Sequence, residues 1–197
     1  MFTGIVEEVG IIEKVNKIDG GKELLISCSF ASDTHVDESI AVDGVCHTVT
    51  EQDSETFKVQ SVDETLRKTS LGGLSKGSKV NLERSLTLEK GIEGHIVQGH
   101  VDTTGRIDKI QKQGADLLMT ISYPKEFDDY VVDRGSIALD GISMTIARTG
   151  ENNFTVAVIP YTWEHTNLIG KKEGGAVNLE FDIFGKYIIK YLKKREG

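Results

Sequence analysis

Apolar and polar residues alternate along most of this chain in short segments that are rich in Val, Ile and Thr. Alternation with a period of two is typical of β-strands with one buried face. Glycine is frequent, with 21 residues, whereas proline occurs twice, so turns separate the segments. The pattern predicts an all-β protein. Its predicted strands span residues 5–15, 23–29, 39–50, 56–61 and 79–83, and then 99–110, 117–122, 136–147, 154–159 and 176–181.

The pattern changes after Gly185. Apolar side chains then recur at the spacing of one helix face, at Tyr187, Ile188, Tyr191 and Leu192. Lysines occupy the other face, so we expect a short amphipathic helix over residues 186–197. Because such a helix has no domain of its own, its apolar face favours packing against another subunit.

The two halves of the chain repeat each other. Residues 42–50 align with residues 139–147 at an offset of 97, and Val-Asn-Leu-Glu at 80–83 recurs at 177–180. Near the start the offset is 95, because Gly4 matches Gly99. Each half would carry about six short strands, and closure into a barrel removes the open edges of a sheet that small. We therefore expect two tandem pseudo-symmetric six-stranded antiparallel β-barrels.

One short stretch in each half has the length of one or two helical turns. These stretches are residues 65–71 and 162–168, and each is expected to plug the space between strands. The predicted domains are residues 1–95 for the first barrel, 96–185 for the second, and 186–197 for the terminal helix.

Composition and charge exclude several classes of protein. Lys and Arg total 23 against 31 Asp and Glu, a net charge of −8, which argues against nucleic-acid binding. The one basic cluster is interpreted as a solvated helix end and consists of Lys190, Lys193, Lys194 and Arg195. No apolar run approaches the roughly 20 residues that span a bilayer. The chain starts without a basic leader, and Cys28 and Cys46 are expected to be free thiols, so we expect a soluble cytoplasmic protein.

Familiar catalytic motifs fit poorly. Residues 72–79 carry glycines at phosphate-loop spacing, but Ser78 stands where that loop needs lysine. Ser143 lacks the second glycine of a nucleophile elbow. His95, His100 and Asp102 are close in sequence, but strand parity would turn the two histidines to opposite faces, so no metal site is expected.

The two halves differ at matched positions where chemistry could reside. The pairs are Cys46 and Ser143, His47 and Met144, Ile5 and His100, and Asp37 and Arg134. Two barrels that share a scaffold but differ in thiol, imidazole and cation would suit two similar ligands in different roles. Ordinary drift after duplication is the better explanation for any single pair. A functional reading is favoured because polar or reactive groups recur within the same blocks that the repeat preserves.

Several motifs resemble a known family in order along the whole chain. They are Met-Phe-Thr-Gly-Ile-Val at 1–6, Gly-Val-Cys at 44–46, Glu-Thr-Leu-Arg-Lys-Thr at 64–69, Asn-Leu-Glu-Arg at 81–84, Gly-His-Ile-Val-Gln-Gly-His-Val-Asp at 94–102 and Asp-Gly-Ile-Ser at 140–143. In these motifs the chain is similar to riboflavin synthase of the alpha-chain type.

The resemblance implies Greek-key barrels of the flavin-reductase-like type and a homotrimer held by C-terminal helices. It implies that two molecules of 6,7-dimethyl-8-ribityllumazine dismutate into riboflavin and 5-amino-6-ribitylamino-uracil by transfer of a four-carbon unit, with no cofactor and no metal. The active site would lie between the N-terminal barrel of one subunit and the C-terminal barrel of its neighbour. Lumazine synthase is a candidate partner; no nucleic-acid or membrane partner is expected.

The resemblance also assigns binding residues. The pocket of the first barrel would consist of Gly4, Ile5, Val6, Cys46, His47, Thr48, Gln60, Ser61, Val62, Asp63, Glu64 and Thr65. The pocket of the second barrel would consist of Gly99, His100, Val101, Arg134, Ser143, Met144, Thr145, Ala157, Val158, Ile159, Pro160, Tyr161 and Thr162.

Catalytic roles follow from the chemistry that the resemblance implies. A proton must leave the C7 methyl group of one lumazine, and a nucleophile or water must add to C7 of the other. His100 is expected to transfer the proton, while Ser143, Thr145 and Cys46 orient the reactants or add to one of them. Phe2 and Thr3 are expected to close the site, and Asp182 to serve a polar network between the barrels.

Two residues depart from the pattern that is usual in the family. His47 stands where an apolar residue is usual and either points outward or bonds Cys46 or a ligand. Arg134 replaces a lysine, which keeps the charge but changes its geometry.

Two other functions are alternatives to the synthase. One is a non-catalytic lumazine or flavin carrier, like the antenna proteins of luminous bacteria. The other, a flavin-binding reductase module, would need a nucleotide-binding domain for which no βαβ segment remains.

Overall fold

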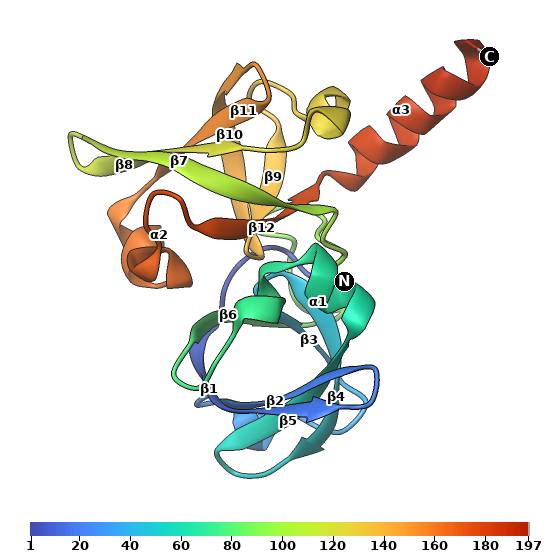
Figure 1. Cartoon of the computed structure of the whole chain (residues 1–197), viewed down its shortest axis with the longest axis vertical. Helices are drawn as coiled ribbons and strands as arrows, with labels where there is room; N and C mark the ends of the chain where they lie inside the picture. Colours follow the sequence, from blue (N-terminus) through green and yellow to red (C-terminus); the bar gives the residue numbers. More distant parts are fainter. Residues whose placement is uncertain (197) are drawn as a thin grey trace.

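The computed structural model, which describes residues 1–196, contains two closed antiparallel barrels of six strands each (Figure 1). The first barrel has the order β1-β2-β5-β4-β3-β6. Its strands are β1 (Glu8–Ile18), β2 (Gly21–Ser27), β3 (Ser39–Val42), β4 (Val45–Gln52), β5 (Thr56–Val62) and β6 (Lys79–Arg84). The second barrel repeats this topology with β7 (Thr103–Gln113), β8 (Asp116–Ser122), β9 (Ser136–Leu139), β10 (Ile142–Gly150), β11 (Asn153–Val158) and β12 (Ala176–Phe181). The predicted fold class is confirmed.

Two predicted strands are hairpins instead. Residues 39–50 and 136–147 were each expected to form one strand, but Asp43-Gly44 and Asp140-Gly141 turn the chain back. All four residues have positive φ, between 45° and 80°. This is the backbone of the two-residue turn that suits the twist of adjacent strands, and Asp-Gly is a preferred sequence for it.

The barrels are filled by the inward-facing residues of their strands. Phe57 and its repeat counterpart Phe154 are fully buried, as are Leu82 and Leu179. Short helices cover the barrels, namely α1 (Asp63–Lys68) and η2 (Ser70–Gly73) in the first half and α2 (Pro160–Glu164) and η4 (Asn167–Gly170) in the second. Leu71 of η2 and Leu168 of η4 are fully buried, and each belongs to the core of its own barrel. This agrees with the expected plugs. The remaining 3₁₀ turns are η1 (Ala31–Asp33) and η3 (Lys125–Tyr130).

The C-terminal helix α3 (Ile183–Glu196) projects away from the second barrel (Figure 1). It begins three residues before the predicted range of 186–197, because an oxygen of Asp182 accepts a hydrogen bond from the N–H of Phe184 at 2.9 Å and caps the first turn. Gly197 lies outside the described residues. Among the described helices, none combines the length and the apolar character needed to cross a bilayer.

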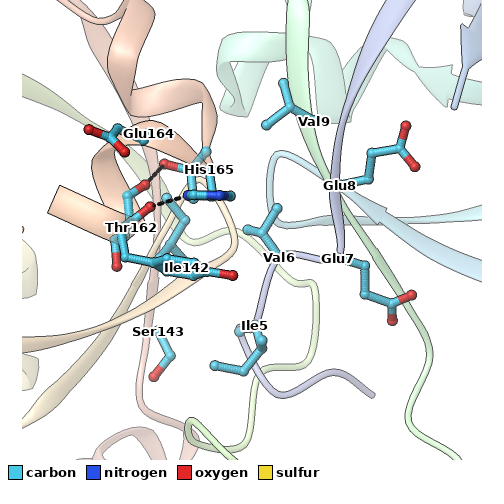
Figure 2. A pocket seen from close by; sticks show the side chains of 13 residues that line it. Ile5, Val6, Glu7, Glu8, Val9, Ile142, Ser143, Thr162, Glu164 and His165 are labelled. Carbon is cyan, nitrogen blue, oxygen red and sulfur yellow. Dashed lines mark hydrogen bonds between the residues drawn. The ribbon is translucent and has the colours of Figure 1, made fainter. Parts of the chain in front are cut away.

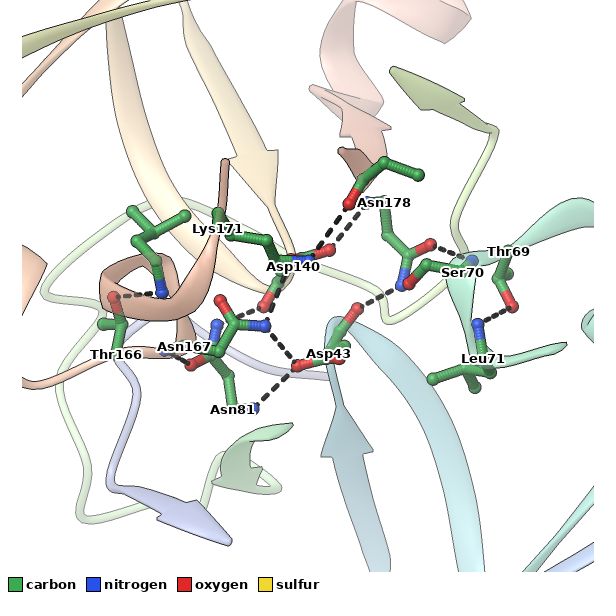
Figure 3. A network of polar contacts seen from close by, with 12 residues as sticks. Asp43, Thr69, Ser70, Leu71, Asn81, Asp140, Thr166, Asn167, Lys171 and Asn178 are labelled. Atoms are coloured by element: carbon green, nitrogen blue, oxygen red, sulfur yellow. Dashed lines mark hydrogen bonds and ion pairs between the residues drawn. The ribbon is translucent and has the colours of Figure 1, made fainter. Parts of the chain in front are cut away.

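A buried polar network joins the two barrels (Figure 3). The amide nitrogen of Asn81 donates to the main-chain oxygen of Asp140 at 3.0 Å, and that of Asn178 donates to the main-chain oxygen of Asp43 at 2.8 Å. Each asparagine also accepts a main-chain N–H, from Asn167 at 2.6 Å and from Ser70 at 2.7 Å, respectively. These reciprocal bonds are related by the repeat, so each barrel satisfies buried polar groups of the other.

The two halves of this network differ in charge. Lys171 forms an ion pair of 2.5 Å with Asp140, whereas its repeat counterpart in the first half is Leu74. Asp43 accepts hydrogen bonds from the main-chain N–H of Asn81 at 2.7 Å and from the Asn167 amide at 2.8 Å. Burial and the neighbouring Asp140 raise the pKa of Asp43 well above its usual range. Two buried carboxyl groups therefore share one lysine, and Asp43 retains a proton that an exposed aspartic acid would release.

Replacing Asp43 with asparagine should stabilise the protein at alkaline pH. In the wild type, the free energy of unfolding falls as pH rises from the ordinary aspartate pKa through the raised one. In this range the Asp43 carboxyl ionises in the unfolded state but stays protonated in the folded state. The introduced asparagine side chain keeps an acceptor oxygen and carries no charge. We expect the free energy of unfolding of Asp43→Asn at pH 8 to exceed that of wild type by about 1–3 kcal/mol, with the gap closing toward pH 4.

Denaturant titrations at both pH values measure this effect. The matched control is Asp140→Asn, which leaves half-buried Lys171 without its ion pair and should destabilise at both values. An Asp43→Asn protein that is less stable than wild type at pH 8 would contradict a protonated Asp43.

Candidate functional site

Two equivalent hollows lie where one barrel meets a segment of the other repeat. The larger, of about 520 Å³, is lined by Ile142 and Ser143 of β10, by Tyr161, Thr162 and residues 164–166 of α2 and the turn after it, and by residues 4–9 (Figure 2). The smaller, of about 260 Å³, is lined by Val45 and Cys46 of β4, by residues of α1 and by residues 99–101. We call them the β10 hollow and the β4 hollow.

The segments that complete the hollows are exchanged between the repeats. Residues 2–6, the first crossing segment, precede the first barrel, but their end at residues 4–6 lines the β10 hollow of the second. Residues 97–101, the second crossing segment, precede the second barrel, but their end at residues 99–101 lines the β4 hollow of the first. The prediction had placed each segment in the pocket of its own barrel, and this pairing is wrong. The repeat offset shows which residues correspond, but it does not show which barrel they touch.

One main-chain hydrogen bond fixes each crossing. The N–H of Ser143 donates to the carbonyl oxygen of Gly4 at 2.7 Å, and the N–H of Cys46 donates to that of Gly99 at 2.9 Å. Both glycines have positive φ, 78° and 79°. A Cβ atom on either would lie 2.6 Å from the Cβ of Ser143 or Cys46. Only glycine permits this approach.

The two hollows present different chemistry at matched positions. In the β10 hollow, Tyr161 and His165 stack one helical turn apart, with ring centroids separated by 4.0 Å. Their counterparts in the β4 hollow are Glu64 and Lys68, which form an ion pair of 2.9 Å. One wall is therefore aromatic and the other is charged. The side chains at the matched strand position differ as well, with Ser143 lining one hollow and Cys46, together with His100, lining the other.

Ser143 has a histidine partner. The Nδ1 atom of His95 lies 2.7 Å from the Ser143 hydroxyl oxygen. Burial lowers the pKa of His95, and the opposing effect of the Asp182 carboxylate is smaller, so a neutral ring faces the hydroxyl group. His95 follows the loop at Gly94, where a side chain would collide with the Thr3 carbonyl and with Ser143. The imidazole can orient the hydroxyl group or exchange a proton with it.

His95, His100 and Asp102, for which no metal site is expected, lie in different surroundings. Residues 95–102 form an irregular segment, because β7 begins only at Thr103, so the strand-parity argument does not apply. His95 bonds Ser143, and exposed His100 lines the β4 hollow. Asp102 accepts the N–H of Phe181 at 2.9 Å and pairs with Lys186 at 2.6 Å.

Four predicted binding side chains face the barrel interiors. They are His47, Ser61, Met144 and Val158, with exposures of 4%, 2%, 7% and 0%. Side chains alternate between the two faces of a strand, so a run of consecutive residues cannot all reach one ligand. Instead, Nδ1 of His47 bonds the Val45 carbonyl at 2.8 Å, and Nε2 lies 2.6 Å from the Ser61 hydroxyl oxygen. A carbonyl only accepts, so Nδ1 carries the hydrogen and Nε2 accepts from Ser61.

Other predicted residues lie on the outward strand face that carries Cys46 and Ser143, or just beyond it. The exposed ones on strands are Thr48, Gln60, Val62, Thr145 and Ala157. Asp63, Ile159 and Pro160 are exposed where α1 and α2 begin, while Thr65 and Thr162 line the hollows. Their binding roles remain predictions.

Four predicted site residues have other surroundings than expected. Phe2 and Thr3 are each 1% exposed, with Phe2 in an apolar cluster beside Val97 and the Thr3 hydroxyl bonded to Glu83, and their role in closing a site stays a prediction. Asp182 caps α3 and does not join the described network between the barrels. Arg134 lies exposed in the turn before β9 with a φ of 61° and is not among the residues that line the β10 hollow.

Several contributors were missed by sequence reasoning. The most informative are Glu83, Glu180, His165 and Lys68, together with His95, which had been considered only as a metal ligand. The two glutamates belong to the perfectly repeated Val-Asn-Leu-Glu block, so a signal was present. His165 and Lys68 lie one helical turn beyond the predicted binding runs, at a spacing that places them on the same helix face.

Comparison with known proteins gives one consistent result. Residues 3–85 and residues 98–182 each match the lumazine binding domain family. The chain is similar to the riboflavin synthase of Actinobacillus pleuropneumoniae, with 43% identity over 196 residues, covering 99% of this chain and 91% of the relative. It is 40% identical over 195 residues to that of Bacillus subtilis, covering 98% and 91%, and 39% identical over 196 residues to that of Schizosaccharomyces pombe, covering 98% and 94%.

Solved structures share the fold. The chain superposes on LumP complexed with 6,7-dimethyl-8-(1'-D-ribityl) lumazine with a TM-score of 0.82 and 24% identity, covering 91% of this chain and 98% of LumP. LumP complexed with riboflavin gives a TM-score of 0.85 and 23% identity, covering 92% and 99%. At this identity the likeness establishes the double-barrel architecture alone.

The buried His47–Ser61 pair should make the first barrel sensitive to acid. Burial lowers the pKa of His47 from 6.5 to about 4. The unfolded state therefore binds the proton first, and stability should fall by roughly 2–3 kcal/mol as pH decreases through this window. The double variant His47→Met, Ser61→Val copies the apolar pair of the second barrel, Met144 and Val158, and should lack most of this loss.

Denaturant titrations at pH 7 and pH 4.5 compare the two proteins. Other groups titrate in this range in both, so the difference between the two proteins is the informative quantity. Equal acid sensitivity of variant and wild type would show that His47 is not the titrating group.

Proposed function

The chain belongs to the riboflavin synthase family, and from this premise we propose how it converts two molecules of 6,7-dimethyl-8-ribityllumazine into riboflavin and 5-amino-6-ribitylamino-uracil. A four-carbon unit passes from one lumazine to the other. Each lumazine occupies one hollow, the first in the β10 hollow of one subunit and the second in the β4 hollow of its neighbour.

One observation carries this proposal: each chain has two hollows built on the same framework, with different chemical groups and on opposite sides of the molecule. Helix α1 walls the β4 hollow and helix α2 walls the β10 hollow, and the two helices lie on opposite sides in Figure 1. Two ligands bound to a single chain therefore face away from each other. Stacked reactants require two chains, each contributing a different hollow.

Helix α3 supplies a surface for such an assembly. Its exposed apolar side chains are Phe184, Tyr187, Ile188, Tyr191 and Leu192, which are between 45% and 69% exposed. A run of large apolar side chains along one projecting helix is typical of a subunit contact. We propose that this helix holds a homotrimer, as the resemblance implies. Every subunit would then offer one hollow to each neighbour.

Positioning would provide much of the rate acceleration, because a face-to-face pair reacts as if at effective concentrations of about 10⁵–10⁸ M. The remaining chemistry moves protons and adds a nucleophile. His100 and Cys46 adjoin the ligand of the β4 hollow, and Ser143 with His95 adjoins that of the β10 hollow. We assign proton transfer at the C7 methyl group to His100. Cys46 and Ser143 would orient the reactants or add at C7.

Two further predictions concern the cellular setting. The free thiols of Cys28 and Cys46 support a reducing compartment, and we propose that the protein works in the cytoplasm. Association with lumazine synthase stays a prediction of the resemblance.

The reaction is tested by incubating the purified protein anaerobically with 6,7-dimethyl-8-ribityllumazine alone. Riboflavin is followed by absorbance and the diaminouracil product by chromatography. We expect both products in equal amounts, since the two are formed from one pair of substrates. Tight binding without turnover by the intact oligomer would identify a carrier instead.

The variant Ile188→Glu tests whether the reaction needs two chains. A carboxylate on the exposed apolar face of α3 should disrupt the assembly while leaving both hollows intact. We expect a monomer by sedimentation that binds riboflavin but turns over at least 100-fold more slowly. The control is Lys194→Glu, which introduces the same side chain on the same helix outside the apolar set and makes an even larger change in charge. A monomer with full turnover would place the reaction within a single chain.

The reacting groups are tested by His100→Gln and Cys46→Ser. If His100 moves the proton, its loss should lower kcat by about 100-fold or more with little change in KM. Cys46→Ser should lower kcat if the thiol adds to C7, and should raise only KM if it is a binding contact. Steady-state kinetics with the lumazine separates these outcomes, and full turnover by His100→Gln would remove the histidine from the chemistry.

A further inference from the structure

Two buried glutamates hold the crossing segments in place. In β6, Glu83 is 3% exposed; its Oε1 atom accepts from the Thr3 N–H and the Thr3 hydroxyl, both at 2.7 Å, and its Oε2 atom accepts from the Gly4 N–H at 3.0 Å. In β12, Glu180 is also 3% exposed and accepts from the N–H groups of Gln98 at 2.6 Å and His100 at 2.8 Å. In each repeat, a buried glutamate thus accepts hydrogen bonds from main-chain N–H groups of a crossing segment.

Each crossing segment is thereby held from two sides. Gly4 donates its N–H to Glu83 of the first barrel, and its carbonyl oxygen accepts the N–H of Ser143 from the second barrel. In the other repeat, Glu180 holds the residues on both sides of Gly99, whose carbonyl oxygen accepts the N–H of Cys46. Neither glutamate lines the β4 or the β10 hollow. Each one acts on a hollow only through the segment that it binds.

A carboxylate is required for this role. The donors converge on both oxygens of each glutamate, and a carboxylate accepts at both, whereas an amide would direct its NH₂ group at one of the N–H donors. Burial raises the pKa of Glu83 and of Glu180, although the main-chain N–H groups oppose this shift. Burying these carboxyl groups is therefore unfavourable in itself, which points to a specific structural purpose.

We propose that Glu83 and Glu180 are positioning residues that act across the molecule: Glu83 of the first barrel sets ligand binding in the β10 hollow of the second, and Glu180 of the second barrel sets binding in the β4 hollow of the first. The proposal rests on the proposed function for the nature of the ligand. It predicts that a substitution in one barrel weakens the hollow of the other barrel.

The chain contains a separate reporter for each hollow. Trp163 is the single tryptophan and lies between Thr162 and Glu164, which line the β10 hollow, so quenching of its fluorescence reports a flavin bound there. Cys46 lines the β4 hollow, so protection from iodoacetamide reports binding there. The other thiol, Cys28, interferes little, because burial and Glu8 raise its pKa to about 12 and alkylation needs the thiolate.

The test titrates riboflavin into wild type, Glu83→Gln and Glu180→Gln and compares the two midpoints. For Glu83→Gln we expect a midpoint about tenfold higher for Trp163 quenching and within twofold of wild type for Cys46 protection. For Glu180→Gln we expect the reverse. Each variant is the matched control for the other, because the substitution and the burial are the same.

Ligands that stack across a subunit interface couple the two reporters, so the ratio of the midpoints is the decisive quantity. Thr3→Val removes one donor from Glu83 without altering the carboxylate and should shift the ratio in the same direction as Glu83→Gln. Each glutamate weakening the hollow of its own barrel, or both variants leaving the ratio unchanged, would overturn the proposal. Wild type that binds riboflavin in neither hollow would instead refute the proposed function.

Discussion

The two crossing hydrogen bonds, from Ser143 to Gly4 and from Cys46 to Gly99, are the constraint on which the rest of the molecule depends. Each joins one barrel to a segment that belongs to the other repeat. Because both bonds involve the main chain of a residue that lines a hollow, the positions of the Ser143 hydroxyl and the Cys46 thiol depend on both barrels. Neither barrel by itself contains a complete hollow. The contact between barrels is therefore part of the functional site.

This arrangement explains why polar groups are buried where the barrels meet. Asn81 and Asn178 each bond the main chain of the opposite barrel, and a small relative movement would leave these donors and acceptors without partners. Such bonds are directional, whereas apolar contacts would tolerate sliding. The central apolar cluster is correspondingly small, consisting of Phe2, Ala41, Val97 and Ala138, with Cys46 packed against it. The relative orientation of the barrels thus rests on hydrogen bonds. The ion pair between Lys171 and Asp140 adds to the half of the polar network that the second repeat contributes.

Much of the fold follows from local patterns, whereas the composition of the hollows does not. The repeat and the period-two alternation predict two closed barrels, and the Asp-Gly pairs at Asp43 and Asp140 carry the signal for the hairpins, because Asp-Gly favours a two-residue turn even within an apolar run. Strand parity similarly indicates that His47 faces inward between Val45 and Val49. The crossing of residues 2–6 and 97–101 is different, because it arises from contacts between residues far apart in sequence. The sequence repeat would look the same whether each crossing segment packed against its own barrel or against the barrel of the other repeat.

Divergence between the repeats is concentrated where the framework permits it. Gly4 and Gly99, Asn81 and Asn178, and Glu83 and Glu180 are identical pairs, because each member bonds the main chain of the opposite repeat or holds the segment that does so. Among the described residues, the side chains that line the hollows make no such bonds between the repeats, and they differ. Cys46 corresponds to Ser143, Glu64 to Tyr161 and Lys68 to His165.

A reaction between two identical molecules needs this combination. The binding frames must be alike so that both accept the same ligand, yet the surrounding groups must differ so that one molecule gives up the four-carbon unit and the other receives it. Because the framework is built from reciprocal main-chain bonds, side chains lining one hollow can change without disturbing the other. Duplication within one chain thereby provides two unlike hollows for a pair of like substrates, which the proposed pairing between chains would bring together.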